Sequence, residues 1–499
     1  MGKNVIARNA SLLTFRMLLA TAVGLFTSRI VLQALGVVDY GIYGVVGGIV
    51  ALAAFLQNAL SGSTSRFLAY AMGQGDFPGL HRCFSTSRAL HYILAGVIVV
   101  AGEALGLIAL NYFLDIPADR MHAARRVLQL SIFQAALTIS QIPCVAFIQA
   151  KEQMQVYAIA EIINVTLRLV IAYTLLIVIT DKLILYAALN LAGTIFLQGF
   201  YQLYCRRRGE LDFSLRIHKE VRDRLLSFSG LDLFSSFSAT LSLQGMNFLV
   251  NIFFGVVYNT AVGLGMVVNG AVIGLATTSW QAFRPQIIKQ YSAGNIREME
   301  TLLRSGSMFS VCAMLLLIIP CLLESGYILQ LWLGEIPPHS VDFLRVILIM
   351  GFFNNLNYQI ATVVQATGEI RNLSVINGLL LLLSPAVAWT GLHYSFPAWS
   401  VYCILAGCYI FCSFNAAVQA GRLIPELDIA GFGRRTISVM VAGIICAAVP
   451  AAIISLWTEP SFLRLVCTTA TFVLVFGTVI WTMFLSKDNK AYLKSLIIK

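Results

Sequence analysis

The chain consists of long apolar runs separated by short polar segments. A membrane-spanning helix needs about 20 predominantly apolar residues, and fourteen stretches of this kind can be placed along the sequence. They run approximately over residues 11–35, 40–61, 89–113, 127–149, 156–180, 183–204, 226–254, 260–283, 305–323, 341–366, 373–394, 398–420, 436–457 and 463–485. No segment between them is long enough for a soluble domain. The pattern predicts an all-α polytopic membrane protein.

The basic residues of the loops predict an orientation. If both termini lie inside, the inner segments carry 25 Lys and Arg, the outer segments carry 5, and 4 more lie within spans. Cytoplasmic loops are enriched in Lys and Arg, so we expect both termini in the cytoplasm. Arg120, Arg125 and Arg126 run against this rule, because they form a cluster in an outer segment.

The two halves of the chain resemble each other. The segment 35–46 (LGVVDYGIYGVV) matches 254–265 (FGVVYNTAVGLG) at an offset of 219 residues. At nearly the same offset, GQGDF (73–77) matches SAGNI (292–296), and Arg66 falls opposite Arg284. Spans 7 to 12 therefore repeat spans 1 to 6. Six is an even number, so the copies share one orientation and predict two bundles that face each other across a central cleft.

This repeat defines the domain organisation that we expect. The N-terminal six-helix lobe is 1–204, the basic cytoplasmic linker is 205–225, and the C-terminal six-helix lobe is 226–420. Helices 13 and 14 (436–485) fall outside the repeat and precede a cytoplasmic tail, 486–499.

Ionisable side chains inside spans are candidates for function, because each needs a partner or a water-filled cavity. Glu103 lies near the middle of helix 3. Glu161 and Arg168 are seven residues apart on helix 5, which places them on one face about 10.5 Å apart. Arg29 lies in helix 1 and is open to two interpretations, a structural ion pair or a position in the cleft. Arg16 either extends to the inner head groups or faces the cleft.

Amide side chains form a second group. Asn354, Asn355 and Asn357 lie at the middle of helix 10, and Asn247 lies in helix 7. Amides within spans often join helices to each other, and the alternative is hydrogen bonding to a hydroxyl-rich ligand. Asp232 and Arg345, near span ends, are open between interfacial anchoring and function.

Composition narrows the function classes. The chain is 58% hydrophobic and 11% charged, and its net charge of +11 is explained by loops that face anionic lipid rather than by nucleic acid. The ten cysteines are scattered and suggest neither a metal site nor a disulfide framework. No phosphate-binding loop and no hydrolase motif is present. We therefore expect no enzymatic activity and no cofactor.

The segment 9–76, which contains SRIVLQALGVVDYGIYGVV and SGSTSRFL, resembles bacterial polysaccharide and O-antigen flippases, as does the later FRPQIIKQYSAGN. These flippases belong to the multidrug/oligosaccharidyl-lipid/polysaccharide exporter superfamily. The resemblance implies a transporter of the bacterial inner membrane. Such a transporter moves undecaprenyl-pyrophosphate-linked oligosaccharide to the outer leaflet, in the service of lipopolysaccharide or other cell-envelope polysaccharide biosynthesis. In relatives the cleft is cationic, and the first-helix arginine falls at Arg29.

The expected substrate-binding set combines the resemblance with the residues above. It comprises Arg29, Arg168, Glu103, Glu161, Arg16, Arg66, Arg284, Asn247, Asn354, Asn355 and Asn357. Expected partners are lipid-linked oligosaccharide, membrane lipids and polysaccharide assembly proteins. A coupling ion, Na⁺ or H⁺, is left open. Two alternatives also remain, a drug/cation antiporter of the same fold and a membrane glycosyltransferase or polymerase.

Overall fold

A computed structural model describes residues 3–51, 64–65, 67–72, 74–151, 153–207 and 211–484. The helices of the first part of the chain are α1 (Lys3–Ala51), α3 (Phe77–Ile108), η1 (Ala109–Phe113), η2 (Ala118–Arg120), α4 (Met121–Ser140), α5 (Ile142–Ala150), α6 (Met154–Ile177), α7 (Lys182–Arg207), α8 (Lys219–Phe254) and α9 (Val256–Ser292). Those of the remainder are α10 (Ile296–Leu323), α11 (Ser325–Leu333), α12 (Ser340–Thr367), α13 (Arg371–His393), α14 (Ser400–Leu423), α15 (Ile429–Ala442), η3 (Gly443–Ala448), α16 (Val449–Trp457), α17 (Phe462–Val479) and η4 (Ile480–Phe484).

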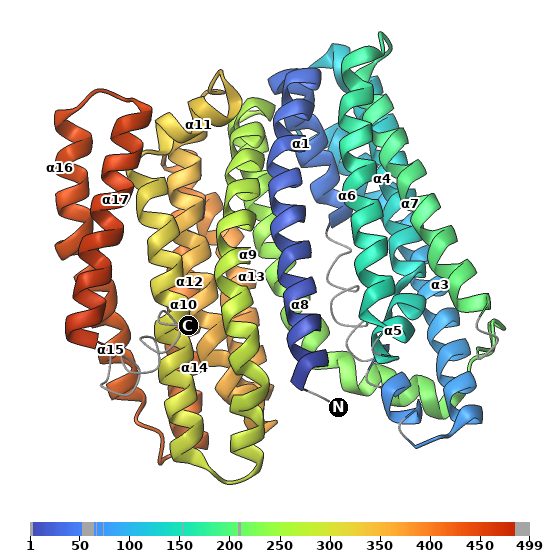
Figure 1. The fold of residues 1–499 in the computed structure, drawn as a ribbon. Helices are drawn as coiled ribbons and strands as arrows, with labels where there is room; N and C mark the ends of the chain where they lie inside the picture. The colour runs from blue at the N-terminus through green and yellow to red at the C-terminus, as the bar shows by residue number, and fades with distance from the viewer. Residues whose placement is uncertain are drawn as a thin grey trace. The chain divides into compact units, whose positions relative to one another are not determined.

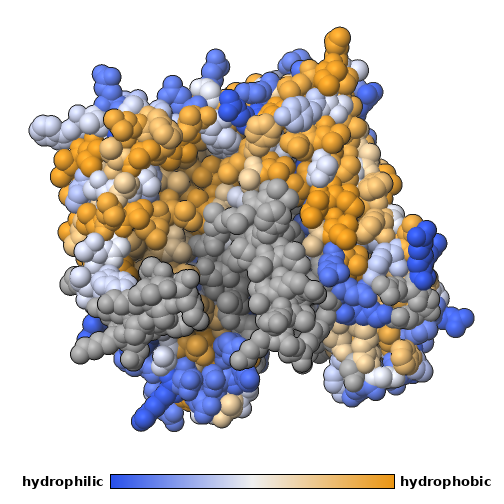
Figure 2. All heavy atoms as spheres, viewed as in Figure 1, coloured by the Kyte–Doolittle hydropathy of each residue, from blue (hydrophilic) through white to orange (hydrophobic). Residues whose placement is uncertain are grey.

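The described residues form helices and connecting turns without any strand, which confirms the predicted fold class (Figure 1). Thirteen of their helical segments are long and apolar enough to cross a membrane. Figure 2 shows hydrophobic side chains along the middle of the helices and hydrophilic ones toward the ends. The chain is therefore a multi-pass membrane protein.

The count of thirteen instead of fourteen has a simple cause. The first two predicted spans both fall in α1, which is divided at Gly36 by a non-helical backbone conformation with φ 77° and ψ 172°. The two segments of α1, 3–35 and 37–51, are drawn in dark blue in Figure 1. Residues 52–61 of the second predicted span lie outside the described residues. The other twelve predicted spans each match one candidate span.

The third span begins earlier than the sequence pattern indicated. The predicted span starts at 89, but α3 begins at Phe77. Asp76 caps the helix by accepting a hydrogen bond from the Gly79 amide, with N···Oδ1 2.8 Å, and Pro78 lies in the first turn. A capping carboxylate followed by proline is a start signal for a helix, and hydrophobicity alone does not detect it.

The internal repeat is visible in the backbone. Gly36 and Gly255 are 219 residues apart, and both have positive φ with ψ near 180°, a region open almost only to glycine. The four backbone hydrogen bonds of the turn 70–77 recur at the corresponding positions of the turn 289–296. Each turn is centred on a glycine of positive φ, Gly75 with 67° and Gly294 with 75°. These shared turns support the repeat that the sequence predicted.

The chain divides into two compact units. The first comprises Met1–Val267, Pro337–His339 and Ser374–Cys408, and the second comprises Val268–Ile336, Ser340–Leu373 and Tyr409–Lys499. In the first unit, Ile42 and Val46 of α1 pack with Val127 and Leu128 of α4 and with Leu183 of α7. The division into six-helix lobes at 204 and 226, and the cleft between them, stay predictions.

The core of the second unit joins its helices at one end. Trp280 of α9 packs with Leu303 of α10, Val363 of α12, Ala420 of α14 and Phe432 of α15. Each of these side chains is less than 5% exposed. The trailing helix α15 is thus part of the same hydrophobic core as the repeat helices of this unit.

Candidate functional site

Arg29 lies on the accessible side of α1 in the first unit. Its side chain is half-buried, between Phe26 and Gln33, which are both exposed one turn to either side. The Phe26 ring lies 6.4 Å from that of Tyr173 on α6. Among the side chains that the structure describes, none forms a hydrogen bond or ion pair with Arg29. Because guanidinium stays charged, this cation within a span is open to an external anion.

Arg168 of α6 is exposed and lies near an aromatic pair. Its guanidinium lies in the neighbourhood of Tyr43 and Tyr186. The rings of these two tyrosines, from α1 and α7, are 4.6 Å apart. Hydroxyl groups beside a guanidinium can hydrogen-bond a phosphate or a sugar, so Arg168 and the tyrosine pair form a second polar position within the spans of the first unit.

The two carboxylates that the sequence singled out are not neutralised by the described cations. Glu103 of α3 and Glu161 of α6 are half-buried, and neither forms an ion pair within the described part of the chain. Arg168 and Glu161 share one helix without a contact, as their separation predicted. These carboxylates are candidates for binding a cation.

Arg284 of α9 has partners from α12 in the second unit. It donates to the Tyr358 hydroxyl at 2.8 Å and to Gln365 Oε1 at 3.2 Å, and its guanidinium lies 5.6 Å from the Tyr358 ring centre. Both partners are neutral. The structure therefore orients Arg284 without cancelling its charge, which suits the binding of an anion.

The predicted amides have different environments. Asn355 is 4% exposed, and its Oδ1 accepts from Gln359 Nε2 at 2.8 Å and from Ser310 of α10 at 3.5 Å. Asn247 Oδ1 accepts from Asn259 Nδ2 at 2.8 Å. These contacts join neighbouring helices and favour the structural interpretation of both amides. Asn354 is exposed, and Asn357 is half-buried.

Three of the residues singled out from the sequence cannot be placed fully, and a fourth, Arg345, can. Arg16 lies in α1 and Asp232 in α8, but their side chains, like the whole of Arg66, fall outside the described part. Arg345 is exposed, and its Nε donates to the Ser325 hydroxyl at 2.8 Å.

Sequence reasoning missed a buried arginine. Arg88 is 7% exposed, donates to the Phe213 carbonyl, and lies 4.6 Å from the Phe213 ring centre. The predicted span begins at 89, which leaves Arg88 in the preceding loop. The helix start at Asp76 was the signal that would have placed Arg88 inside α3. Its contacts fix residue 213 of the basic linker to α3.

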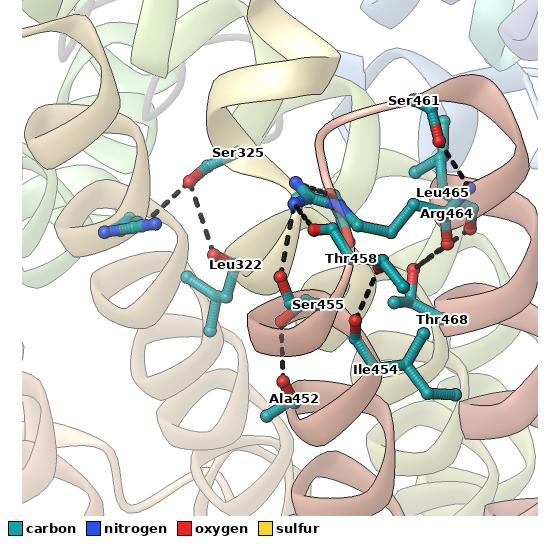
Figure 3. A network of polar contacts seen from close by, with 12 residues as sticks. Leu322, Ser325, Ala452, Ile454, Ser455, Thr458, Ser461, Arg464, Leu465 and Thr468 are labelled. Carbon is teal, nitrogen blue, oxygen red and sulfur yellow. Dashed lines mark hydrogen bonds and ion pairs between the residues drawn. The ribbon is translucent and has the colours of Figure 1, made fainter.

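A buried ion pair was also missed, and Figure 3 shows the hydrogen bonds around it. Arg464 of α17 pairs with Glu324 at 2.7 Å, and their side chains are 11% and 0% exposed. Arg464 also donates to the carbonyl oxygens of Ser455 at 3.2 Å and Thr458 at 2.9 Å. The pair connects the end of α10 to the α16–α17 hairpin, 140 residues away. No local sequence pattern links residues that far apart.

Comparison with known proteins supports the fold. No protein-family model and no curated protein matches the chain. A solved structure described as an inward-facing multidrug resistance MATE family transporter of the MOP superfamily is 16% identical, with a TM-score of 0.62, and the match covers 84% of this chain and 96% of that one. An outward-facing MATE structure matches with a TM-score of 0.56 at 17% identity, over the same shares of the two chains.

A MOP superfamily transporter from Pyrococcus furiosus also matches, with a TM-score of 0.57 and 17% identity over 84% of this chain and 96% of that one. Its description states that the reversed polarity of its binding pocket suggests a different function. At these identities the likeness shows the fold alone. The chain has the fold of MATE-like transporters.

Proposed function

We propose that this protein is a flippase. It carries an undecaprenyl-pyrophosphate-linked oligosaccharide from the cytoplasmic to the outer leaflet of a bacterial inner membrane. The observation that carries the proposal is Arg29, a permanent cation within a span that has no acidic partner among the described residues. An uncompensated arginine within a membrane is costly unless it serves an anionic ligand or a water-filled path.

The chemistry of the other candidate residues supports this substrate class. Guanidinium binds phosphate oxygens through paired, charge-assisted hydrogen bonds. Arg168 lies near the hydroxyl groups of two tyrosines, and Arg284 is held by a phenol and an amide. Hydroxyl and amide groups suit the sugar part of the substrate. A potential that is negative inside favours the export of an anion by about 2.3 kcal/mol per charge per 100 mV.

The mechanism that we propose is alternating access. The two repeats rock against each other, the head group passes through the polar space between them, and the polyprenyl tail stays in the bilayer. Solved structures with this fold are described in inward-facing and outward-facing conformations. In this mechanism the protein forms and breaks no covalent bond.

The test is replacement of Arg29 in a host that lacks the chromosomal copy. The lipid-linked glycan accumulates inside the host when transport fails. We expect R29A to restore less than a tenth of the wild-type transport rate, because one charge-assisted phosphate contact is worth roughly 1.5–3 kcal/mol. R29K keeps the charge and restores more. Gln33, exposed one turn away on the same helix, provides the control variant Q33A. Normal transport by R29A at equal expression would refute the role of Arg29.

A drug/cation antiporter of the same fold is the second candidate, and Glu103 and Glu161 favour it. Two half-buried carboxylates without an ion pair among the described residues could bind a drug cation or a coupling ion. Purified protein in vesicles distinguishes the two. An antiporter transports an organic cation in exchange for Na⁺ or H⁺ and loses this activity in E161Q. A flippase transports lipid-linked sugar and does not transport the organic cation.

A further inference from the structure

A cavity of about 460 Å³ lies between residues 67–83 and the start of α8. Its lining includes Tyr70, Asp76, Arg82, His218, Lys219 and Glu220. Pockets that bind small ligands usually have about 300–1,000 Å³, so this cavity is large enough for a lipid head group. It joins the end of the basic linker to the N-terminal end of α3.

The linker wall of this cavity is fixed by specific contacts. The His218 amide donates to the Thr86 hydroxyl at 3.0 Å, which holds the residue before Lys219 against α3. Earlier in the linker, the Phe213 ring centre lies 4.6 Å from the guanidinium carbon of Arg88 and 5.3 Å from that of Arg206. The predicted linker is thus attached to α3, and the position of Lys219 is set before any ligand binds.

The charges in the cavity favour an anion. Arg82 and Lys219 are exposed and form no ion pair within the described part of the chain. Asp76 is already engaged, because its carboxylate accepts the Gly79 amide at 2.8 Å and caps α3. Both carboxylates of the lining lie at helix N-termini, Asp76 as the cap of α3 and Glu220 in the first turn of α8. The partial positive charges of these two helix ends offset part of the carboxylate charge, which leaves the two cations in excess. The exposed Tyr70 adds a hydroxyl group to the lining; it accepts from Gln74 Nε2 at 2.8 Å and keeps its own proton to donate.

The geometry points to a phosphate-binding site in this cavity, in which Arg82 and Lys219 bind the phosphate oxygens of an anionic lipid head group. The predicted orientation places the cavity at the cytoplasmic surface, where anionic lipids attract basic segments. Inorganic phosphate carries the same chemistry, and the experiment distinguishes the two sources. The site does not depend on the proposed transport function.

The experiment measures the melting temperature of the detergent-solubilised full-length protein. One arm titrates dihexanoyl-phosphatidylglycerol and the other titrates inorganic phosphate. We expect saturable stabilisation by the lipid, and at least a tenfold increase of its half-saturating concentration in R82Q/K219Q. The control K289Q/R297Q removes two exposed cations beside the matching turn of the second repeat, and we expect it to bind as the wild type does.

The outcomes separate as follows. A shift by lipid alone identifies the head group as the ligand, and a shift by both ligands identifies a general phosphate site. Either result supports the proposal if R82Q/K219Q needs a much higher ligand concentration for the same shift in melting temperature. Equal half-saturation in wild type and R82Q/K219Q, or no shift with either ligand, would overturn it. If the double variant does not fold, K219Q alone replaces it, with an expected weakening of at least threefold.

Discussion

At the scale of single residues, the basic side chains differ in how their charge is balanced. Arg120 is bound by two carboxylates, Asp39 at 2.6 Å and Asp181 at 3.0 Å. It belongs to the cluster that runs against the predicted orientation, and the structure shows why its charge is tolerated there. Arg29 has no such partner among the described side chains. The functional proposal depends on this difference between an arginine that is paired with carboxylates and one that is not.

Glu324 provides a prediction about stability. E324Q removes the charge that Arg464 meets in a buried site, and breaking a buried pair on one side costs roughly 3–5 kcal/mol. We expect the melting temperature of the purified protein to fall by several degrees. E335Q changes an exposed glutamate of the neighbouring loop and should leave it unchanged. An unchanged melting temperature in E324Q would show that the pair contributes nothing.

Asp181 provides a prediction about pH. Burial raises its pKa, but hydrogen bonds from Arg120 and from the amides of Ile184 and Leu183 outweigh this, and the pKa is lowered from 3.8. The ionised carboxylate therefore stabilises the protein above the ordinary pKa, and this contribution is lost as the pH falls through the lowered value. D181N should melt below wild type at pH 7, and the gap should narrow below pH 3.8. A gap independent of pH would contradict this.

At the scale of elements, two glycines divide long helical stretches into hairpins. Gly36 separates the two segments of α1, and Gly255 separates α8 from α9, with nearly the same backbone angles. The hairpins pack closely in the first unit. A Cβ on Gly41 would lie 2.0 Å from the Val256 carbonyl oxygen, and the Thr260 hydroxyl donates to the Val37 carbonyl at 2.5 Å. Position 41 therefore requires glycine because of this contact.

The hairpin glycines can be tested by substitution. G36A and G255A place a Cβ in a backbone region that costs about 1–3 kcal/mol for other residues, so each should lower the free energy of unfolding by that amount. G44A is the control, since Gly44 is helical and a Cβ there meets no atom within 4 Å. We expect it to be neutral or slightly stabilising. Chemical unfolding of the purified variants measures the difference, and equal effects at all three positions would contradict the argument.

At the scale of the whole molecule, the predicted orientation has a direct test. Alkaline phosphatase folds only outside the cytoplasm, whereas green fluorescent protein fluoresces inside. We expect phosphatase activity for a fusion after Asp181 and fluorescence for fusions after Ile217 and after the C-terminal Lys499. The opposite pattern would invert the orientation and place the phosphate cavity on the outer side.

The sequence alone determined the helical class, the positions of the spans that the structure describes, and the repeat. Each of these depends on local information: apolar runs of span length, and glycines at a fixed offset that require the same turn. Asp76 and Pro78 are also local signals for the start of α3, although the hydrophobic pattern by itself predicts a later start. The candidate cations within spans were found in the same way.

The tertiary structure alone decided which of these charges are balanced. Arg120 meets Asp39 across 81 residues and Asp181 across 61, and Arg464 meets Glu324 across 140. Likewise, Arg88 attaches the linker residue Phe213, 125 positions away, to α3. The strength of a charge interaction depends on distance and burial, and neither quantity is fixed until the helices pack.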